Sequence, residues 1–554
     1  MTTLPSGLPV VVDRDGGQPL AIQISAQLQT AVTGGALRAG DRLPSSRDLA
    51  ATLGVSRTVI TNAYARLFAE GWLEGRHGSG TYVADVGPAA AGGTREPGQW
   101  PGGVPGRGSA GAGANTDSER AVVSPGRTAV SVSGMSASGG PVPPAAMIDL
   151  QPGISWPDGI DPASWRRAWR QAGAHLPSSR PDPHGLPELR AEIAAYLRRS
   201  RGLTVTPAHV LITQGVSSGL ALLADALLAR GDKAGMEEPG YPTGREVLRR
   251  AGARVVPCRV DAHGILPEAL PGDLRLLYTT PAHQYPLGGR LPVNRRQALV
   301  AWARATGALV VEDDYDSEFR YDVGPLPALH SMDPDVIVYL GTASKVLATA
   351  FGAGWLVAPP ALVDRLAALR PRLGVRIPES VQHAVLALLR SGDLERHIRK
   401  MRLEYARRRA ALVGPLTHAS PGVAGVASAA EPDGAAGAGS PARPRFRLLG
   451  DTAGMHVVLE LPGDYPAARL IEAAAARGVV VYPLTRYFAG PPTLNGLVLG
   501  YGTATLPQVR RAAAELAALL TRLPSTGFST DSSTDSSTDS NTGKQKLAEE
   551  TYPR

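Results

Sequence analysis

One lysine of the chain lies among apolar residues, where an amine changes its chemistry. Residues 336–340 form an apolar run that predicts a buried strand, and the small residues 341–344 connect it to Lys345, which Val346 and Leu347 follow. Burial disfavours the charged form of an amine and lowers its pKa, so the amine becomes a nucleophile toward carbonyl groups. By itself, this stretch is also compatible with a lysine that reaches solvent at the end of a strand.

A second stretch supplies the groups that would accompany such an amine. Residues 308–311 predict a strand that delivers Asp313 and Tyr315 to its C-terminal end. Ligands of open α/β sheets bind beyond the C-terminal ends of the strands, so we expect Lys345 to lie near both residues. An amine for a Schiff base, a carboxylate for a pyridinium nitrogen and a hydroxyl for the ring oxygen are what pyridoxal 5′-phosphate (PLP) requires.

The segments EDDYDSEFRY, at 312–321, and YLGTASK, at 339–345, resemble the signatures of fold-type I, class I/II aminotransferases. In this form they are most similar to MocR-type regulators, which fuse a GntR-family DNA-binding domain to an aminotransferase-like domain. The resemblance covers residues 20–84 and roughly 148–524. It implies an α/β fold with an N-terminal winged helix-turn-helix, and it makes Lys345 the residue that forms the Schiff base with PLP.

Length and composition limit the architecture and the compartment. The chain has 554 residues, too many for one domain, and its hydrophobic fraction of 43% suffices for large cores. The single cysteine, Cys258, excludes an internal disulfide framework and fits a reducing compartment. The sequence shows no transmembrane run and no signal peptide. We therefore expect a cytoplasmic protein that does not bind a membrane.

Composition divides the chain into four parts. We expect a DNA-binding domain at 1–84, a disordered linker rich in Gly, Ala, Pro and Ser at 85–147, a large domain at 148–524 and a disordered polar tail at 525–554. A flexible coil of the linker's length spans roughly 45 Å on average, which would let two DNA-reading heads adopt several spacings. Residues 419–445 read as a surface insertion.

The N-terminal region predicts three helices. Apolar residues at helical spacing predict the first at 20–33; Ser45 and Asp48 form a capping box that begins the second, which ends at Gly54; and Ser56 can cap the third. The third helix has an apolar stripe of Ile60, Ala63, Tyr64, Leu67 and Phe68. Its opposite face is polar and suits DNA reading, with Arg57, Thr58, Thr61 and Asn62. A small helical bundle with a solvated face is the alternative.

Two short strands, at 72–74 and 81–83, flank a Gly-rich tip and predict a wing. With the segments LPSSRDLA and VSRTV they resemble the GntR-type winged helix. This resemblance implies that the DNA contacts are Arg47, Arg57, Thr58, Thr61, His77 and Gly78. Six arginines against four acidic residues leave 20–84 with a net charge of only +2, so we expect a homodimer that binds two half-sites of a double-stranded DNA operator.

In the large domain, alternating strands and helices predict a parallel sheet with crossover helices. The strands are expected at 210–213, 253–257, 275–278, 308–311 and 336–340. The first leads into Gly215, Val216 and Ser217 at a helix start, where backbone amides and a hydroxyl suit a phosphate. By resemblance, Tyr241 stacks on the cofactor ring, and Tyr285 and Ser344 also contact the cofactor. No metal site is predicted.

Three positions depart from the family pattern. Gly352 stands where the family usually has the arginine that pairs with the cofactor phosphate. Arg180 replaces a tyrosine that reaches the neighbouring subunit's site, which makes it a candidate cofactor ligand in trans. The segment 497–502 lacks the usual arginine for a substrate carboxylate, for which Arg486 is a candidate.

Three functions are compatible with these observations. The first is a transcriptional regulator that binds PLP and senses a small amine, an amino acid or PLP itself. The second is an active aminotransferase with a DNA-binding appendage, and the third is a regulator whose aminotransferase fold has lost the cofactor. The winged helix favours the first and third, whereas Lys345, Asp313 and Tyr315 favour the first and second. Gly352 and the missing carboxylate arginine argue against efficient turnover and leave the third function open. We expect the first, with at most weak transaminase activity.

Overall fold

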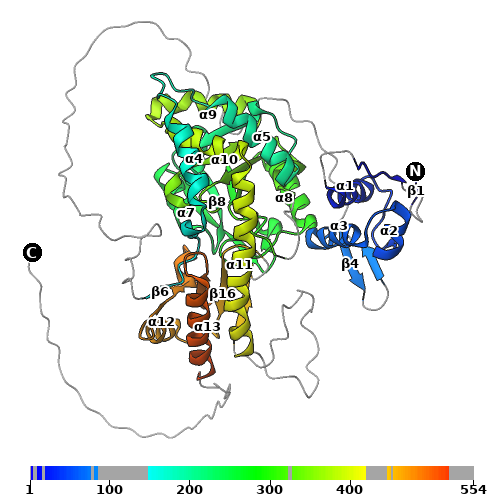
Figure 1. The fold of residues 1–554 in the computed structure, drawn as a ribbon, viewed down its shortest axis with the longest axis vertical. Helices are drawn as coiled ribbons and strands as arrows, with labels where there is room; N and C mark the ends of the chain where they lie inside the picture. Colours follow the sequence, from blue (N-terminus) through cyan, green and yellow to red (C-terminus); the bar gives the residue numbers. More distant parts are fainter. Residues whose placement is uncertain are drawn as a thin grey trace, which may run out of the picture.

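The structure is a computed structural model, and it describes residues 2–3, 9–14, 19–76, 80–84, 147–321, 327–419, 446–450, 453–463 and 465–522. They form an N-terminal head, a large α/β domain and a C-terminal subdomain (Figure 1). The predicted tail lies outside the described residues, as do the predicted linker and insertion apart from Met147 and Ala419. Among the residues described, no helix is both long and apolar enough to cross a membrane.

The head is a winged helix. Its helices are α1 (Leu20–Thr33), α2 (Ser46–Leu53) and α3 (Arg57–Glu70), and its strands are β3 (Arg42–Leu43), β4 (Leu73–Arg76) and β5 (Gly80–Val83), after the short pair β1 (Thr2–Thr3) and β2 (Pro9–Val10). The predicted N-cap of α2 is confirmed, because the Asp48 amide donates to Ser45 Oγ at 3.2 Å, but the return bond of a capping box, from the Ser45 amide to the Asp48 side chain, is not among the described hydrogen bonds. Helix α2 ends at Gly54, whose φ of 63° is in the left-handed region that glycine tolerates.

Two predictions about α3 are wrong. Ser56 precedes the helix, but its side chain makes no capping hydrogen bond. Phe68 is 38% exposed, whereas Ile60, Ala63, Tyr64 and Leu67 are buried. The apolar stripe therefore ends at Leu67, one residue earlier than its spacing indicates.

The large domain is built on an eight-stranded mixed sheet of order β10-β9-β8-β11-β12-β13-β14-β7. Its strands are β7 (Val210–Thr213), β8 (Lys233–Glu238), β9 (Arg254–Asp261), β10 (Gly264–Ile265), β11 (Leu276–Thr279), β12 (Leu309–Asp314), β13 (Ile337–Thr342) and β14 (Gly354–Val357). The central strands are parallel, as predicted, but β14 runs antiparallel to both β13 and β7. The chain between β13 and β14 is too short for a helical crossover, so β14 must return beside β13 in the opposite direction.

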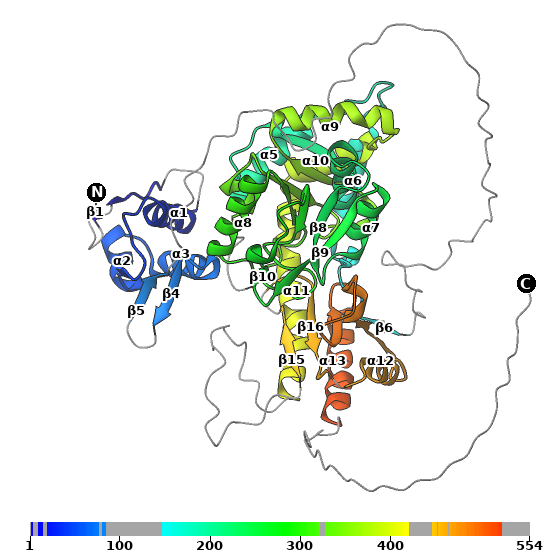
Figure 2. The same ribbon diagram turned by 180° about the vertical axis from the view of Figure 1, so that it is seen from behind.

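Helices cover both faces of the sheet. They are α4 (Pro162–Gly173), α5 (Pro187–Arg201), α6 (Val216–Leu227), α7 (Pro242–Arg250), α8 (Val293–Thr306), α9 (Pro360–Leu373), α10 (Glu379–Arg390) and α11 (Asp393–His418). Alternate residues of a strand point to opposite faces. In β7, Leu211 packs in one core cluster with α6 and α9, whereas Val210 and Ile212 pack in another with α5 and α10. The sheet is thus the middle layer of three (Figure 2).

The C-terminal subdomain packs against the end of the long helix α11. It contains β15 (Arg447–Leu449), β16 (His456–Glu460), α12 (Ala467–Ala475), β17 (Val479–Val480), β18 (Tyr482–Pro483), β19 (Gly496–Gly500) and α13 (Leu506–Thr521). Strand β6 (Ile148–Asp149), at the start of the large domain, pairs with β17. This pairing brings the chain after Asp149 next to the sheet, where it completes the cavity described below.

Candidate functional site

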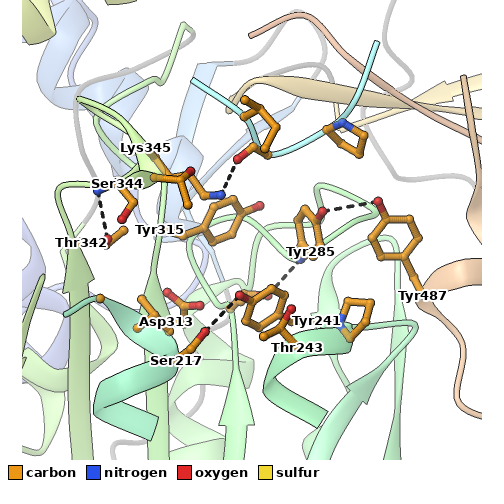
Figure 3. A pocket seen from close by; sticks show the side chains of 18 of the residues that line it. Ser217, Tyr241, Thr243, Tyr285, Asp313, Tyr315, Thr342, Ser344, Lys345 and Tyr487 are labelled. Carbon is orange, nitrogen blue, oxygen red and sulfur yellow. Dashed lines mark hydrogen bonds between the residues drawn. The ribbon is translucent and has the colours of Figure 1, made fainter. Parts of the chain in front are cut away.

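A cavity of about 510 Å³ lies at the C-terminal ends of β11, β12 and β13 (Figure 3). Three further segments close it: the start of α6, the loop 151–154, and residues 482–487 of the C-terminal subdomain. This is the edge where parallel strands deliver their ligand-binding side chains. Nine predicted cofactor residues line this one cavity: Lys345, Asp313, Tyr315, Tyr241, Gly215, Val216, Ser217, Ser344 and Tyr285.

The amine of Lys345 points into the cavity from the loop after β13. Its Nζ donates a hydrogen bond to the carbonyl of Gly153 (Figure 3). Desolvation lowers the pKa of Lys345, and the negative charges of Asp313 and Asp316 partly oppose this effect. A lysine with a lowered pKa keeps more of its amine neutral, which is the form that attacks carbonyl groups.

Asp313 presents one carboxylate oxygen to the cavity. Tyr278, on β11, donates a hydrogen bond to Oδ2, while Oδ1 is buried and has no partner among the described residues. Burial raises the pKa of Asp313 to about 7. Buried polar atoms are almost always hydrogen-bonded in proteins, so an orphan oxygen facing a cavity indicates a ligand atom that donates to it. Sequence reasoning missed Tyr278, although it ends a predicted strand beside the strand that carries Asp313.

The hydroxyl of Tyr315 lies 2.9 Å from His283 Nδ1. The same ring nitrogen lies 2.9 Å from Asp316 Oδ2, and His283 is buried. His283 therefore holds Tyr315 and Asp316 together as a structural residue at the cavity wall. Its neighbour His456 is neutral at physiological pH, because burial lowers the pKa of His456 to about 4.

The start of α6 forms a cradle of donors. Gly215 precedes the helix with a φ of 125°, which favours glycine. The hydroxyls of Thr342 and Ser344 lie close to it, since a Cβ at Gly215 would be 3.8 and 3.9 Å from their oxygens. Free amides at a helix start bind phosphate. Among the described residues that line the cavity, the cationic ones are Lys345 and Arg486.

Aromatic side chains form the opposite wall. Tyr241 bonds Ser217 Oγ through its hydroxyl at 3.2 Å, and its ring stacks on Tyr278 with centroids 6.3 Å apart. Tyr285 and Tyr487 meet edge to face, with hydroxyls 3.4 Å apart (Figure 3). Tyr487, which the sequence did not single out, comes from the C-terminal subdomain.

Two positions that depart from the family pattern lie outside this cavity. Arg180 is exposed on the loop before α5 and does not line the cavity of its own chain. Gly352 has a φ of 59°, and no atom lies within 4 Å of the position its Cβ would occupy. Neither therefore supplies a charge to the cradle from within this chain.

The candidate DNA contacts lie on the surface of the head. Arg47, Arg57, Thr58 and Thr61 are exposed, and they lie on α2 and on the first half of α3. His77 and Gly78, the predicted wing contacts, lie outside the described residues. No group of three or more His, Cys, Asp or Glu side chains in the described part of the chain could hold a metal ion.

Two family models match the chain. Residues 20–83 match the bacterial regulatory proteins of the gntR family, and residues 155–434 match aminotransferase class I and II. The chain is 34% identical over 510 residues to the HTH-type pyridoxine biosynthesis transcriptional regulator PdxR of Corynebacterium glutamicum, covering 92% of this chain and 98% of that regulator. It is 31% identical to the probable rhizopine catabolism regulatory protein MocR of Rhizobium meliloti, covering 94% of this chain and 97% of that protein.

The chain belongs to the MocR-type transcriptional regulators. As a MocR-type regulator, it has a DNA-binding head of the GntR family and an aminotransferase-like domain that binds PLP. Solved structures agree on the fold of the second part. An archaeal alanine:glyoxylate aminotransferase is 25% identical with a TM-score of 0.60, over 68% of this chain and 90% of that one. The α-aminoadipate aminotransferase LysN of Thermus thermophilus is 24% identical with a TM-score of 0.58, over 68% of this chain and 92% of that one.

The cavity of this MocR-type regulator fits PLP. The orphan oxygen of Asp313 suits a protonated ring nitrogen, and the amides at Gly215 and Val216 suit the phosphate. When bound, PLP supplies an aldehyde that reacts with amines. The residues that would hold PLP here are Lys345 for the aldehyde, Asp313 for the ring nitrogen and the start of α6 for the phosphate, all of which line the cavity.

Proposed function

We propose that this MocR-type regulator senses a small amine, an amino acid or PLP itself through the cavity, and that it binds its operator as a homodimer in the cytoplasm. One observation carries the proposal: the cavity has the amine and carboxylate that PLP needs, yet none of the described residues brings a guanidinium to its phosphate cradle. Such a cavity is more compatible with PLP that dissociates and exchanges with free PLP in the cell than with the permanently bound PLP of an enzyme.

The proposed roles follow from position. Lys345 forms the covalent bond to PLP, Asp313 accepts from the ring nitrogen, and Tyr315 donates to the ring oxygen. Tyr241 stacks on the ring, and Tyr285, whose ring meets that of Tyr241 edge to face, contacts the cofactor from the same aromatic wall. The phosphate lies against Gly215, Val216, Ser217 and Ser344. Arg486, which also lies over the ring of Tyr482, binds the carboxylate of an amino-acid effector.

The missing charge at the phosphate cradle corresponds to a loss of binding free energy for PLP. A hydrogen bond to a charged group contributes about 1.5–3 kcal/mol net. Its absence therefore weakens binding by roughly ten- to a hundredfold. Tight PLP binding by one subunit then depends on a cation from the second subunit of the dimer. PLP occupancy would therefore respond both to PLP concentration and to the pairing of subunits, which favours PLP itself as one of the molecules sensed.

The test is the variant Lys345→Ala. We expect the wild type to show the absorbance of a lysine–PLP bond, which borohydride reduces and traps, and we expect Lys345→Ala to lack it. We also expect operator binding to lose its response to PLP in this variant. Lys400→Ala is the matched control, because Lys400 also donates to a backbone carbonyl, that of Gly159 at 2.9 Å, but lies outside the cavity.

Two results would contradict the proposal. If the lysine–PLP absorbance survives in Lys345→Ala, another residue holds the cofactor. If operator binding by Lys345→Ala responds to PLP as the wild type does, the cavity is not the sensor. Turnover of amino acids by the wild type at rates typical of enzymes, on the order of 1–1000 per second, would favour the second candidate, an active aminotransferase.

A further inference from the structure

The DNA-reading head packs against helix α8 of the large domain (Figures 1 and 2). Val293, the first residue of α8, is 3% exposed and belongs to the head's core cluster, whereas Leu299 and Ala303 of the same helix pack in a cluster of the large sheet. A Cβ at Gly71 of the head would lie 3.5 Å from Pro292. A second cavity, of about 530 Å³, lies beside this contact between α1, the end of α3 and α8.

The two sides of this contact carry opposite charges. Glu70, the last residue of α3, is 7% exposed and accepts a hydrogen bond from Arg66 at 2.9 Å and another from Gln29. Arg296 of α8 lines the same cavity. Burial raises the pKa of Glu70, while the charges of Arg66 and Arg296 lower it. Both side chains are 7% exposed, so the attraction between Glu70 and Arg296 is screened less than that of an ion pair at the surface.

Arg296 also reaches the strands of the cofactor cavity. Its guanidinium donates to the carbonyls of Leu291 at 2.8 Å, Pro327 at 3.0 Å and Pro281 at 3.2 Å. Pro281 follows Thr280, which lines the cofactor cavity at the end of β11. The buried side chain of Arg296 therefore faces the head on one side and, on the other, binds the segment that follows β11 at the cofactor cavity.

A second connection runs through β12. Glu312 precedes Asp313, and its two oxygens accept from the amides of Leu329 and His330 at 2.8 Å each. These residues belong to the short helix Leu329–Met332, whose Ser331 and Met332 line the cavity beside the head together with the preceding Ala328. A shift of β12 at Asp313 would therefore move Leu329 and His330, and with them the surface that the head contacts.

We propose that the face of α8 with Val293, Arg296, Gln297 and Ala301 is a docking surface for the chain's own DNA-reading head, and that docking transmits occupancy of the cofactor cavity to operator affinity. The inference rests on the proposed function. The docked head keeps Arg47 and Arg57 exposed, so docking and DNA binding are compatible. In a dimer, docking would give the two heads a defined separation, in place of the several spacings that the linker's reach alone predicts.

The test variant is Val293→Asp in the full-length protein. The added carboxylate lies in the first turn of α8, where it favours the helix, but it enters the head's apolar core and approaches Glu70. Asn294→Asp is the matched control, because it adds the same charge to the same turn at an exposed position. Ala301→Glu, on the docking face, is a second variant that needs no change at the helix start.

Each variant is measured for PLP affinity, for operator affinity with and without PLP, and for amide exchange in α1 and α8. We expect PLP to change the operator affinity of the wild type and of Asn294→Asp by about 5- to 150-fold, and that of Val293→Asp and Ala301→Glu by less than about twofold. PLP affinity should stay within about twofold of the wild type in all variants, while amides of α1 exchange faster in the two docking variants.

The outcomes separate this inference from the proposed function. If the wild type binds no PLP, or its operator affinity ignores PLP, the proposed function fails and the inference with it. If the wild type responds to PLP and both docking variants respond equally, the docking surface alone is overturned. Unchanged exchange of α1 amides in both docking variants would also overturn it.

Discussion

Asp313 is held in the cavity in a state that costs stability until a ligand binds. Its unpaired oxygen is buried, and the pKa of about 7 means that near neutral pH the carboxyl is only partly ionised. An unfolded aspartate has a pKa of about 3.9. Because the folded pKa is raised, the folded state binds the extra proton between these values, and stability falls as pH rises from about 4 through about 7.

The first prediction concerns Asp313→Asn. Without PLP, we expect the melting temperature of the variant, relative to the wild type, to rise between pH 5 and pH 8, because asparagine does not ionise while Asp313 does. With PLP bound, we expect the variant to melt at a lower temperature than the wild type, since asparagine cannot pair as an anion with a protonated ring nitrogen. Thermal unfolding at both pH values, with and without PLP, measures this. A difference that does not change with pH would show that Asp313 is not desolvated as described.

The second prediction concerns Tyr278→Phe. Loss of the hydroxyl removes a donor that favours the ionised form of Asp313, so the pKa of Asp313 rises further. Because a hydrogen bond to a charged group contributes about 1.5–3 kcal/mol, we expect PLP affinity at pH 7 to fall by roughly ten- to a hundredfold. Titrations between pH 6 and pH 9 should show the loss shrinking as pH rises.

Tyr339→Phe is the control for this variant. The Tyr339 hydroxyl donates to Asp314 Oδ2 at 2.8 Å, so the change removes a tyrosine–aspartate bond one strand away and outside the cofactor cavity. Equal losses of PLP affinity in both variants would mean that Tyr278 acts through general stability of the sheet and does not position Asp313.

At the scale of elements, the start of α3 projects its polar residues away from the large domain. Arg57 is the first residue of this helix, is exposed, and has its Nε 3.4 Å from Ser46 Oγ of α2. Ser46 belongs to the helix that crosses the DNA backbone in a helix-turn-helix, so this contact orients Arg57 between the two helices.

The third prediction is that Arg57→Ala lowers the discrimination between operator and random DNA. A bidentate contact with a base contributes about 1–3 kcal/mol. Arg38→Ala, which removes an exposed arginine outside the three helices of the head, should weaken both kinds of DNA binding equally. Competition binding at a fixed salt concentration measures both. Unchanged discrimination in Arg57→Ala would remove this residue from the reading face.

At the scale of the whole molecule, the phosphate cradle needs a charge, and no described residue of the same chain brings a guanidinium to it. Arg180 is exposed on a loop, where the family pattern has a tyrosine that reaches the neighbouring subunit. We therefore predict that Arg180 of each subunit approaches the phosphate in its partner. Arg180→Ala should weaken PLP binding by roughly ten- to a hundredfold, and the exposed Arg170→Ala should not.

Gly352→Arg should partly restore PLP binding to Arg180→Ala. There is open space at Gly352, but its φ of 59° makes any other residue strained by about 1–2 kcal/mol, so the restoration is incomplete. PLP titration of the wild type, both single variants and the double variant measures how much of the lost PLP affinity Gly352→Arg restores. If Arg180→Ala binds PLP as tightly as the wild type, the charge does not cross the dimer interface.

Much of the molecule follows from local sequence patterns. Helical spacing predicted α1 at its observed bounds, and the capping box placed the start of α2. Apolar runs located β12, which carries Asp313, and β13, which Lys345 follows. Because the C-terminal ends of parallel strands share one edge of a sheet, these runs also brought nine cofactor residues into one cavity. Periodicity and strand direction are properties of short segments, so the sequence by itself determined them.

Contacts between distant segments were decided only by the tertiary structure. Tyr278 meets Asp313 across 35 residues of sequence, and Val293 packs into a head that ends more than two hundred residues earlier. Strand β8 was missed because its charged residues hide the apolar signal, and Glu237 is tolerated in it because Thr279 and Thr280 satisfy its carboxylate. Such partners depend on which surfaces meet when the chain folds, and no local pattern records that choice.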